Sequence, residues 1–217
     1  MSTIALVTGG NRGIGLATAL RLRESGYQVV VGSRSGEAPD GLDTVRLDVS
    51  SPESINAAFD DIESRFGTVG LLVANAGITR DGLLMRMSDE DIDDVLQTNL
   101  AGSIRLARRA LKGMIRARAG RIIFVGSVVG LLGSGGQVNY AAAKAGLVGA
   151  ARSLAREVGS RGITVNVIAP GFVETDMTAE LDDAVRAGIL GGIPLGRYAQ
   201  PAEIADTVDF LASASYI

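Results

Sequence analysis

Short runs of apolar and β-branched residues alternate along the chain with longer segments in which apolar residues recur at helical spacing. Most of the short runs contain few polar residues, which is typical of strands buried on both faces of a parallel sheet. They predict six strands, at Ile4–Thr8, Gln28–Gly32, Thr44–Leu47, Leu71–Ala74, Ile122–Gly126 and Thr164–Ala169.

The longer segments predict helices, and two of them begin with capping signals. Ser50 with Glu53, next to Pro52, and Ser88 with Asp91 have the spacing of N-terminal caps. Strands that alternate with helices imply right-handed crossovers and a parallel sheet with helices on both faces. With no internal linker or repeat, residues 1–217 are expected to form a single α/β domain of the doubly wound, Rossmann type. The expected helices are Ile14–Ser25, Pro52–Phe66, Asp89–Arg116, Tyr140–Arg161 and Pro201–Ser213.

The composition limits the chemistry, because the 217 residues include no histidine and no cysteine. Without them there are no disulfides, no thiolate or imidazole catalysts and none of the usual zinc, copper or haem ligands, so no metal site is expected. Any acid–base chemistry must rest on Tyr, Lys, Asp, Glu or a chain of waters.

The charge balance limits the partners. With 21 basic and 24 acidic residues the formal net charge is −3, which argues against a nucleic acid or an anionic membrane. One long uncharged stretch, residues 122–143, is interrupted by glycines and polar residues, so it does not predict a membrane span. The N-terminal residues are not typical of a signal peptide, and a cytoplasmic location is expected.

The first predicted strand leads directly into a glycine-rich turn, TGGNRGIG at residues 8–15, and then into a helix. The free N–H groups and the dipole at a helix N-terminus favour anions, and glycine lets the backbone approach a pyrophosphate. The spacing is G-x-x-x-G-x-G rather than the more common G-x-G-x-x-G. Such a turn can be purely structural, but its position after the first strand favours a dinucleotide site.

The residues after the second strand bear on the choice of cofactor. An NAD-specific site carries an acidic residue there, which binds the ribose 2′-hydroxyl. This chain has Arg34 instead, and Arg34 and Arg12 together suit the contacts of a 2′-phosphate. The alternative is that both are solvated surface charges. The pattern favours NADPH over NADH.

Tyr140 and Lys144 lie at i and i+4 on a predicted helix, so their side chains project from one face. A phenol has a reference pKa of about 10, and a nearby ammonium is expected to lower it. Such a pair often arises by chance on a helix surface. Ser127 strengthens the catalytic interpretation, because it ends the fifth strand at the edge where parallel sheets bind ligands.

Other features allow two interpretations. Asn75 follows the fourth strand, Asn99 lies inside a long helical segment, and Pro170-Gly171 follow the sixth strand; each is either an ordinary structural residue or part of a cofactor site. The helix from Tyr140 carries many small residues, which indicate packing within the chain or against a second subunit: Ala141, Ala142, Ala145, Gly146, Gly149 and Ala150.

Taken together, these motifs resemble the short-chain dehydrogenase/reductase family. TGGNRGIG, the Ala-Asn-Ala-Gly segment at 74–77, Ser127 with Tyr140-x-x-x-Lys144, and Pro170-Gly171 occur in the order and spacing of the family. The resemblance implies that Tyr140 donates a proton to the substrate oxygen, which Ser127 orients. It also implies that Lys144 binds the nicotinamide ribose and tunes Tyr140, and that Asn99 anchors a water.

The resemblance further implies NADPH or NADP as the cofactor. Asp48 is expected at the adenine, Asn75 beside the adenosine ribose and Thr175 near the nicotinamide carboxamide. Arg12 and Arg34 match basic positions that recognise the 2′-phosphate. The expected cofactor-binding residues are Gly9, Asn11, Arg12, Gly13, Ile14, Gly15, Arg34, Asp48, Val49, Asn75, Ala76, Gly77, Tyr140, Lys144, Pro170, Gly171, Val173 and Thr175.

Within the family, residues 126–149, 153–178 and 193–213 resemble reductases of 3-oxoacyl groups attached to acyl carrier protein. This implies NADPH-dependent reduction to the 3-hydroxyacyl group in fatty acid elongation, by a homotetramer that binds acyl carrier protein. Arg118 and Arg161 resemble the arginines that dock the acidic carrier, although both can equally be surface charges.

Two further expectations concern the C-terminal part. The family continues past Ile217 into a seventh strand that this sequence does not contain, so we expect an exposed sheet edge and a weaker tetramer interface. Met177–Leu195, with several glycines, predicts a mobile lid over the substrate.

Two alternatives remain open. The same chemistry can act on a CoA thioester, a polyketide intermediate or a sugar alcohol, depending on the loops at 128–137 and 175–195. A non-catalytic NADP-binding scaffold is also conceivable, but it would not need Asn99, Ser127, Tyr140 and Lys144 together.

Overall fold

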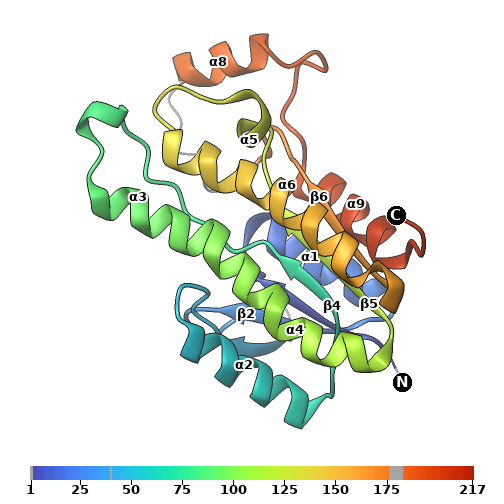
Figure 1. Ribbon diagram of the computed structural model, residues 1–217. Helices are drawn as coiled ribbons and strands as arrows, with labels where there is room; N and C mark the ends of the chain where they lie inside the picture. Colours follow the sequence, from blue (N-terminus) through green and yellow to red (C-terminus); the bar gives the residue numbers. More distant parts are fainter. Residues whose placement is uncertain (1, 40, 176–182) are drawn as a thin grey trace.

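The computed structural model describes residues 2–39, 41–175 and 183–217. In this part of the chain all strands are parallel and form one sheet in the order β3-β2-β1-β4-β5-β6 (Figure 1). This confirms the predicted α/β fold. The strands are β1 (Ile4–Thr8), β2 (Gln28–Ser33), β3 (Asp43–Arg46), β4 (Val69–Ala74), β5 (Gly120–Val125) and β6 (Ile163–Ile168).

Helices cover both faces of the sheet, as Figure 1 shows. On one face lie α2 (Pro52–Arg65), α4 (Ser103–Ala117) and α6 (Val138–Val158). On the other face α1 (Gly13–Glu24) and α9 (Pro201–Ser213) pack against each other. This two-sided cover explains why the strands read as nearly continuous apolar runs.

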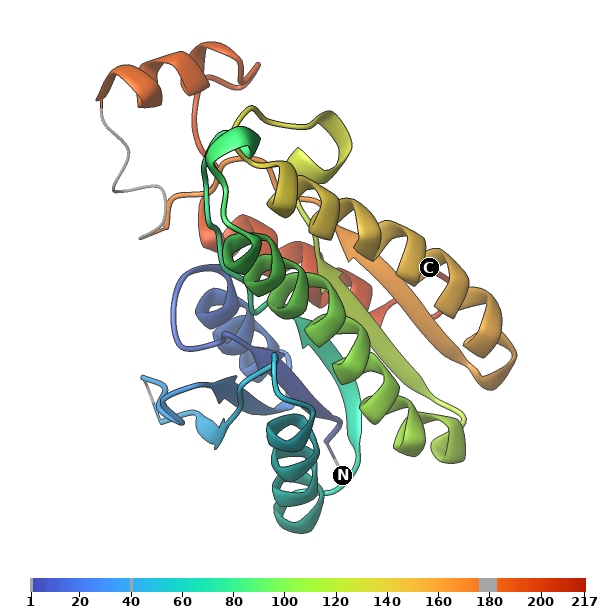
Figure 2. The same cartoon turned by 60° about the vertical axis from the view of Figure 1, so that its left-hand side comes forward.

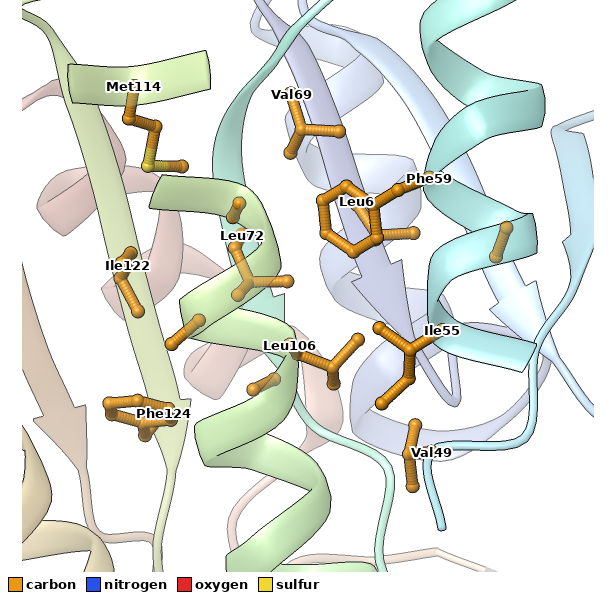
Figure 3. Packing of buried hydrophobic residues seen from close by; sticks show 14 of the residues in the cluster. Leu6, Val49, Ile55, Phe59, Val69, Leu72, Leu106, Met114, Ile122 and Phe124 are labelled. Atoms are coloured by element: carbon orange, nitrogen blue, oxygen red, sulfur yellow. The ribbon is translucent and has the colours of Figure 1, made fainter. Parts of the chain in front are cut away.

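A hydrophobic core fills the space between the sheet and the first group of helices. Figure 3 shows Ile55 and Phe59 of α2 and Leu106 of α4 gathered around Leu6 and Leu72 of the sheet. Each such side chain contributes about 1.5–3 kcal/mol by its burial, so the packing holds the helices at defined positions over the strands.

The helix predicted at Asp89–Arg116 is three elements rather than one. It begins as α3 (Asp89–Val95), widens into the π-helical segment η2 (Leu96–Gly102), and continues as α4. A Cβ at Gly102 would lie 2.6 Å from the Val49 carbonyl oxygen, so the widened turn is pressed against the chain after β3. Such π-helical turns are rare and frequent at functional sites, and this one contains Asn99.

The helix caps agree with the sequence in one case and differ in the other. Ser88 caps α3 in a reciprocal capping box with Asp91, as predicted. The cap of α2 is Ser51, whose hydroxyl accepts a hydrogen bond from the Ser54 N–H at 3.1 Å. The predicted cap, Ser50, is wrong by one residue, because its side chain donates to Asp48 instead.

Four short elements complete the described chain: η1 (Leu84–Arg86), α5 (Val129–Leu132), η3 (Gly159–Arg161) and α8 (Asp183–Gly191). Of the predicted lid, residues 177–182 lie outside the described residues, and α8 occupies much of the remainder. No helix among the residues described here has the length and apolar character needed to cross a membrane.

The parallel register brings the carboxyl ends of the strands to one edge of the sheet. Thr8 is aligned with Gly32, and Ala74 with Phe124. Figure 2 shows α8 beyond this edge, and the carboxyl ends of α4 and α6 at the opposite one. The strand order reverses between β1 and β4, and open α/β sheets bind ligands at such a point.

Candidate active site

The turn after β1 forms a tight cradle at the N-terminus of α1. The Gly9 N–H donates to the Gly32 carbonyl at 2.7 Å, and Gly9 and Gly13 have positive φ values of 63° and 53°. A Cβ at Gly15 would clash with the Gly9 carbonyl oxygen. The Arg12 side chain does not cap α1, and the first turn holds no acidic residue. The N–H groups of this turn therefore suit an anion such as a pyrophosphate.

Thr8 and Asn75 fasten this cradle to β4. The buried Thr8 hydroxyl accepts hydrogen bonds from the N–H groups of Asn75 at 3.1 Å and Ala76 at 3.0 Å. The Asn75 side-chain amide donates to the carbonyls of Thr8 at 3.0 Å and Gly9 at 3.2 Å. Asn75 thus shapes the cradle, and its contact with the adenosine ribose stays a prediction.

The residues predicted to bind the adenine end lie after β2 and β3 and at the start of α1. Arg12 and Arg34 are exposed. Asp48 accepts hydrogen bonds from the Ser50 hydroxyl at 2.6 Å and N–H at 2.9 Å, which lower the pKa of its carboxyl, and the nearby Arg34 lowers it further. Val49 has its side chain in the hydrophobic core, so only its backbone is left for a cofactor contact.

The chain after β6 folds over the cradle. A Cβ at Gly13 would lie 3.4 Å from Thr175 Cγ2, so Thr175 faces the start of α1. The Pro170 carbonyl accepts a hydrogen bond from the Val128 N–H at 3.0 Å, which joins this loop to the one after β5, and Val173 is buried. The remaining predicted cofactor residues also lie at this edge or on α1: Asn11, Ile14, Ala76, Gly77 and Gly171.

Ser127, Tyr140 and Lys144 lie together beyond the end of β5. The Ser127 hydroxyl is a hydrogen-bond partner of the Tyr140 phenol and accepts a hydrogen bond from the Val129 N–H at 3.2 Å. Lys144 Nζ lies 5.5 Å from the centroid of the Tyr140 ring and donates to the Val125 carbonyl at 2.8 Å. Lys144 is only 5% exposed. The structure therefore brings these three predicted side chains together.

Burial governs the ionisation of this group. It raises the pKa of Tyr140, the Ser127 hydroxyl offsets part of the rise, and Asp81 adds to it. Burial also lowers the pKa of Lys144 to about 8. The expectation that Lys144 lowers the pKa of Tyr140 is wrong as a net effect, because desolvation of the phenol is the larger contribution. Tyr140 is protonated at neutral pH, as a proton donor must be.

Asn99 is fully buried beside Lys144. Its Oδ1 accepts a hydrogen bond from the Ile78 N–H and its Nδ2 donates to the Ile78 carbonyl, both at 2.9 Å. A Cβ at Gly77 would lie 3.1 Å from Asn99 Oδ1 and 3.7 Å from Lys144 Nζ, so both groups approach the same point. The fourth predicted catalytic residue is thus close to the other three, and the water it is expected to anchor stays a prediction.

Arg118 and Arg161, predicted to dock a carrier protein, lie at the opposite edge of the sheet. Arg118 follows α4 with a left-handed φ of 52°, and its Nη2 donates to the Ser160 carbonyl at 3.3 Å. Arg161 directly follows Ser160 in η3, after α6, and both arginines are exposed. The two arginines therefore lie near each other, and the length of α6 separates them from Tyr140 in the first turn of that helix.

The small residues of α6 serve two sides of the helix. Ala143 is fully buried, and a Cβ at Gly146 would lie 2.9 Å from Leu100 Cδ2, so this side packs within the chain. Ala145 and Gly149 are exposed, and a Cβ at Gly149 would meet no atom within 4 Å. Packing within the chain explains one side, and the subunit interpretation stays open for the other.

Two residues of the site carry too weak a sequence signal to be predicted. Thr8 is a threonine at the end of an apolar strand, and its position alone does not predict that its hydroxyl accepts a hydrogen bond from Asn75. Asn139 directly precedes Tyr140 and is buried, with hydrogen bonds to the Arg80 carbonyl before α3 and to the Asp91 carbonyl in the first turn of α3. A polar residue next to the tyrosine was the available signal, but its partners lie elsewhere in the chain.

A glycine cradle, a tyrosine beside a buried lysine and a neighbouring serine on one parallel sheet define a class of nucleotide-dependent oxidoreductases. The family described as short chain dehydrogenase matches residues 3–186, and the chain belongs to this family.

Its relatives carry a more particular name. The chain is 52% identical to the 3-oxoacyl-(acyl carrier protein) reductases of Escherichia coli (strain K12) and Vibrio cholerae, over 224 residues that cover 99% of this chain and 92% of each relative. It is 49% identical to the reductase of the same name from Mycobacterium avium, over 219 residues that cover 100% of this chain and 86% of the relative. The predicted resemblance is confirmed.

Proposed function

We propose that the chain is an NADPH-dependent reductase of 3-oxoacyl groups on acyl carrier protein, which forms 3-hydroxyacyl groups in fatty acid elongation. The observation that carries this proposal is the gathering of Ser127, Tyr140, Lys144 and Asn99 beside the glycine cradle. The names of relatives that are 52% and 49% identical over nearly the whole chain support the substrate.

The cradle fits a dinucleotide, since its uncapped helix N-terminus has no room for a side chain at Gly15. The first turn of α1 would hold the pyrophosphate, Arg12 and Arg34 the 2′-phosphate, and Lys144 the nicotinamide ribose. When bound, the reduced nicotinamide supplies the hydride for the carbonyl carbon of the substrate.

Tyr140 gives its phenolic proton to the substrate oxygen, and Ser127 donates a hydrogen bond to the same atom. The raised pKa keeps Tyr140 protonated until the oxygen becomes basic enough to take the proton. The phenolate that results is stabilised by the ammonium of Lys144, whose Nζ lies 5.5 Å from the ring centroid.

Tyr140 must then regain a proton. Lys144 suits this step, because a group with a pKa of about 8 exchanges protons readily near neutral pH. The water expected near Asn99 would connect this amine to solvent.

For the carrier protein we propose docking at Arg118 and Arg161, where two cations suit an acidic partner. A carrier protein bound at this edge would deliver its acyl group to Tyr140 of a neighbouring copy rather than to Tyr140 of the same chain. The proposal therefore requires a second copy, and we propose a homotetramer. Pairing α4 antiparallel about a two-fold axis would bring the Arg118 end of one copy near Asn99 of the other.

Steady-state oxidation of NADPH tests the function, with the same short 3-oxoacyl group offered on acyl carrier protein and on CoA. We expect turnover of both, a higher kcat/KM with the carrier protein, and much weaker use of NADH. Equal kcat/KM values on the two carriers would contradict docking. No turnover of either, with NADPH still bound, would contradict the substrate.

A further inference from the structure

Tyr140 lies in the first turn of α6, and this turn lacks an ordinary cap. α6 begins at Val138, and the side chain of its cap residue, Gln137, accepts no hydrogen bond from the helix. The N–H groups of a first turn have no partner within the helix, and helix ends fray. A side chain that must stay beside Ser127 and Lys144 therefore needs an anchor from elsewhere.

Asn139 provides an anchor of this kind. The residue is 3% exposed, and its Oδ1 accepts a hydrogen bond from the Tyr140 N–H at 2.7 Å. Its Nδ2 donates to the carbonyls of Arg80 and Asp91, each at 3.1 Å. One buried amide thus joins the first turn of α6 to two points of the segment that leads from β4 into α3.

The same segment is held at its start by another residue of the site. Asn99 binds both backbone groups of Ile78. The segment 78–91 therefore contacts one predicted catalytic residue at its start and, through Asn139 at its end, the first turn of α6, which carries Tyr140. Gln137 also donates to Asp81 at 2.9 Å, but that bond is exposed. The bonds of Asn139 are more buried, and loss of a buried hydrogen bond costs more.

We propose that Asn139 is a positioning residue, whose amide holds the first turn of α6 so that the Tyr140 phenol stays between Ser127 and Lys144. The proposal rests on the proposed function only in that Tyr140 is the proton donor.

A loosened turn would admit water to the phenol. Among the described residues, the charged groups that face Tyr140 are Lys144 from its own helix and Asp81 from the segment after β4, and the chain after β5 presents the neutral Ser127. Because burial is the main cause of the raised pKa, loosening should bring the pKa of Tyr140 down toward its ordinary value.

Two substitutions test the anchor. Asn139→Asp keeps the size and an acceptor oxygen but removes both N–H donors, and Asn139→Ala removes the whole group. We expect kcat to fall on the order of tenfold to a hundredfold in each, while the KM for the 3-oxoacyl substrate and the Kd for NADPH change little. Asn166→Ala is the matched control, since the Asn166 amide also donates to a backbone carbonyl, that of Ile217 at 3.0 Å, but lies on β6. It should leave kcat unchanged.

Two further readouts separate positioning from a general loss of structure. In a Tyr140→Phe background the Asn139 substitutions should cause no additional loss of kcat. Ultraviolet difference titration of each protein against its Tyr140→Phe counterpart should show that phenolate forms at lower pH in Asn139→Ala, which adds no carboxylate to oppose the shift. A loss of kcat that persists without Tyr140, or an unmoved titration, would overturn the proposal. The titration needs no substrate, so it decides this point even if the wild type reduces no 3-oxoacyl group.

Discussion

Burial acts in opposite directions on the two ionisable side chains of the site, because it disfavours the charged form of each. It keeps Tyr140 as a neutral phenol and brings the pKa of Lys144 to about 8. Near neutral pH the pair is thus a neutral acid beside an ammonium that is close to its own titration. This combination suits a reaction in which a proton is given and must then be replaced.

Removal of the phenolic hydroxyl tests the proton donor directly. We expect Tyr140→Phe to lower kcat by roughly two to four orders of magnitude, because the variant lacks the phenolic proton of the proposed donor. Affinity for NADPH, measured by fluorescence titration, should change little. Tyr216→Phe is the control, since Tyr216 is 98% exposed, and should leave kcat unaltered. Turnover of Tyr140→Phe near the wild-type rate would show that another group supplies the proton.

Lys144 gives a prediction about stability and pH. Its pKa is about 8 in the folded chain, against 10.5 for the ordinary side chain. Between these values the unfolded chain binds more protons, so the contribution of Lys144 to the free energy of unfolding increases as the pH rises. Relative to Lys144→Met, the Tm of the wild type should therefore increase between about pH 7 and pH 9.5. Circular dichroism melts of both proteins measure this difference, and a pH-independent difference would contradict the burial of an ammonium.

At the scale of elements, the strands and most helices follow from local pattern, and the π-helical turn does not. The apolar residues at 96–102 recur at the spacing of an ordinary α-helix, so the hydrophobic period does not distinguish this segment from its neighbours. The turn is instead shaped by distant contacts: Asn99 binds Ile78, 21 positions away, and Gly102 abuts the carbonyl of Val49.

The candidate site divides in the same way. The glycine turn and the Tyr140–Lys144 pair depend on spacing along one strand–turn–helix unit or one helix, so the sequence predicts them. The roles of Thr8 and Asn139, and the direction of the Tyr140 pKa shift, depend on burial and on partners from other elements. Spacing alone therefore names the reacting groups but not the residues that hold them.

The cradle at the start of α1 gives a prediction at this scale. Gly15→Ala would place a Cβ against the Gly9 carbonyl and within 2.6 Å of Asn75 Nδ2, so the turn must move. We expect a loss of roughly 1–3 kcal/mol in the free energy of unfolding and at least about tenfold weaker NADPH binding. Gly188→Ala in α8 is the control, because a Cβ there meets no atom within 4 Å. Unchanged NADPH affinity in Gly15→Ala would refute the cradle as the phosphate site.

For the whole molecule, the two edges of the sheet divide the proposed tasks. The carboxyl edge carries the cofactor cradle and Tyr140, and the opposite edge carries Arg118 and Arg161. Open surface on α6 around Gly149, and Ile104 and Ile115 of α4 at 43% and 40% exposure, offer apolar area for a second copy. Association would then be part of substrate delivery as well as of stability.

The distance between the arginine pair and Tyr140 has a consequence for mixtures of defective chains. A Tyr140→Phe chain keeps its arginines, and a chain with Arg118→Glu and Arg161→Glu keeps its catalytic group. Co-expressed, the two should complement each other and recover about a quarter of wild-type turnover at limiting carrier protein, if chains pair at random and one of the two sites in a mixed pair works. Preformed oligomers mixed without exchange are the control and should stay inactive. Absence of recovery on co-expression would mean either that the carrier protein docks on the arginines of the same chain that reduces its acyl group, or that these arginines do not dock the carrier protein. With recovery, a cell that holds both defective alleles would make the product although neither allele alone suffices.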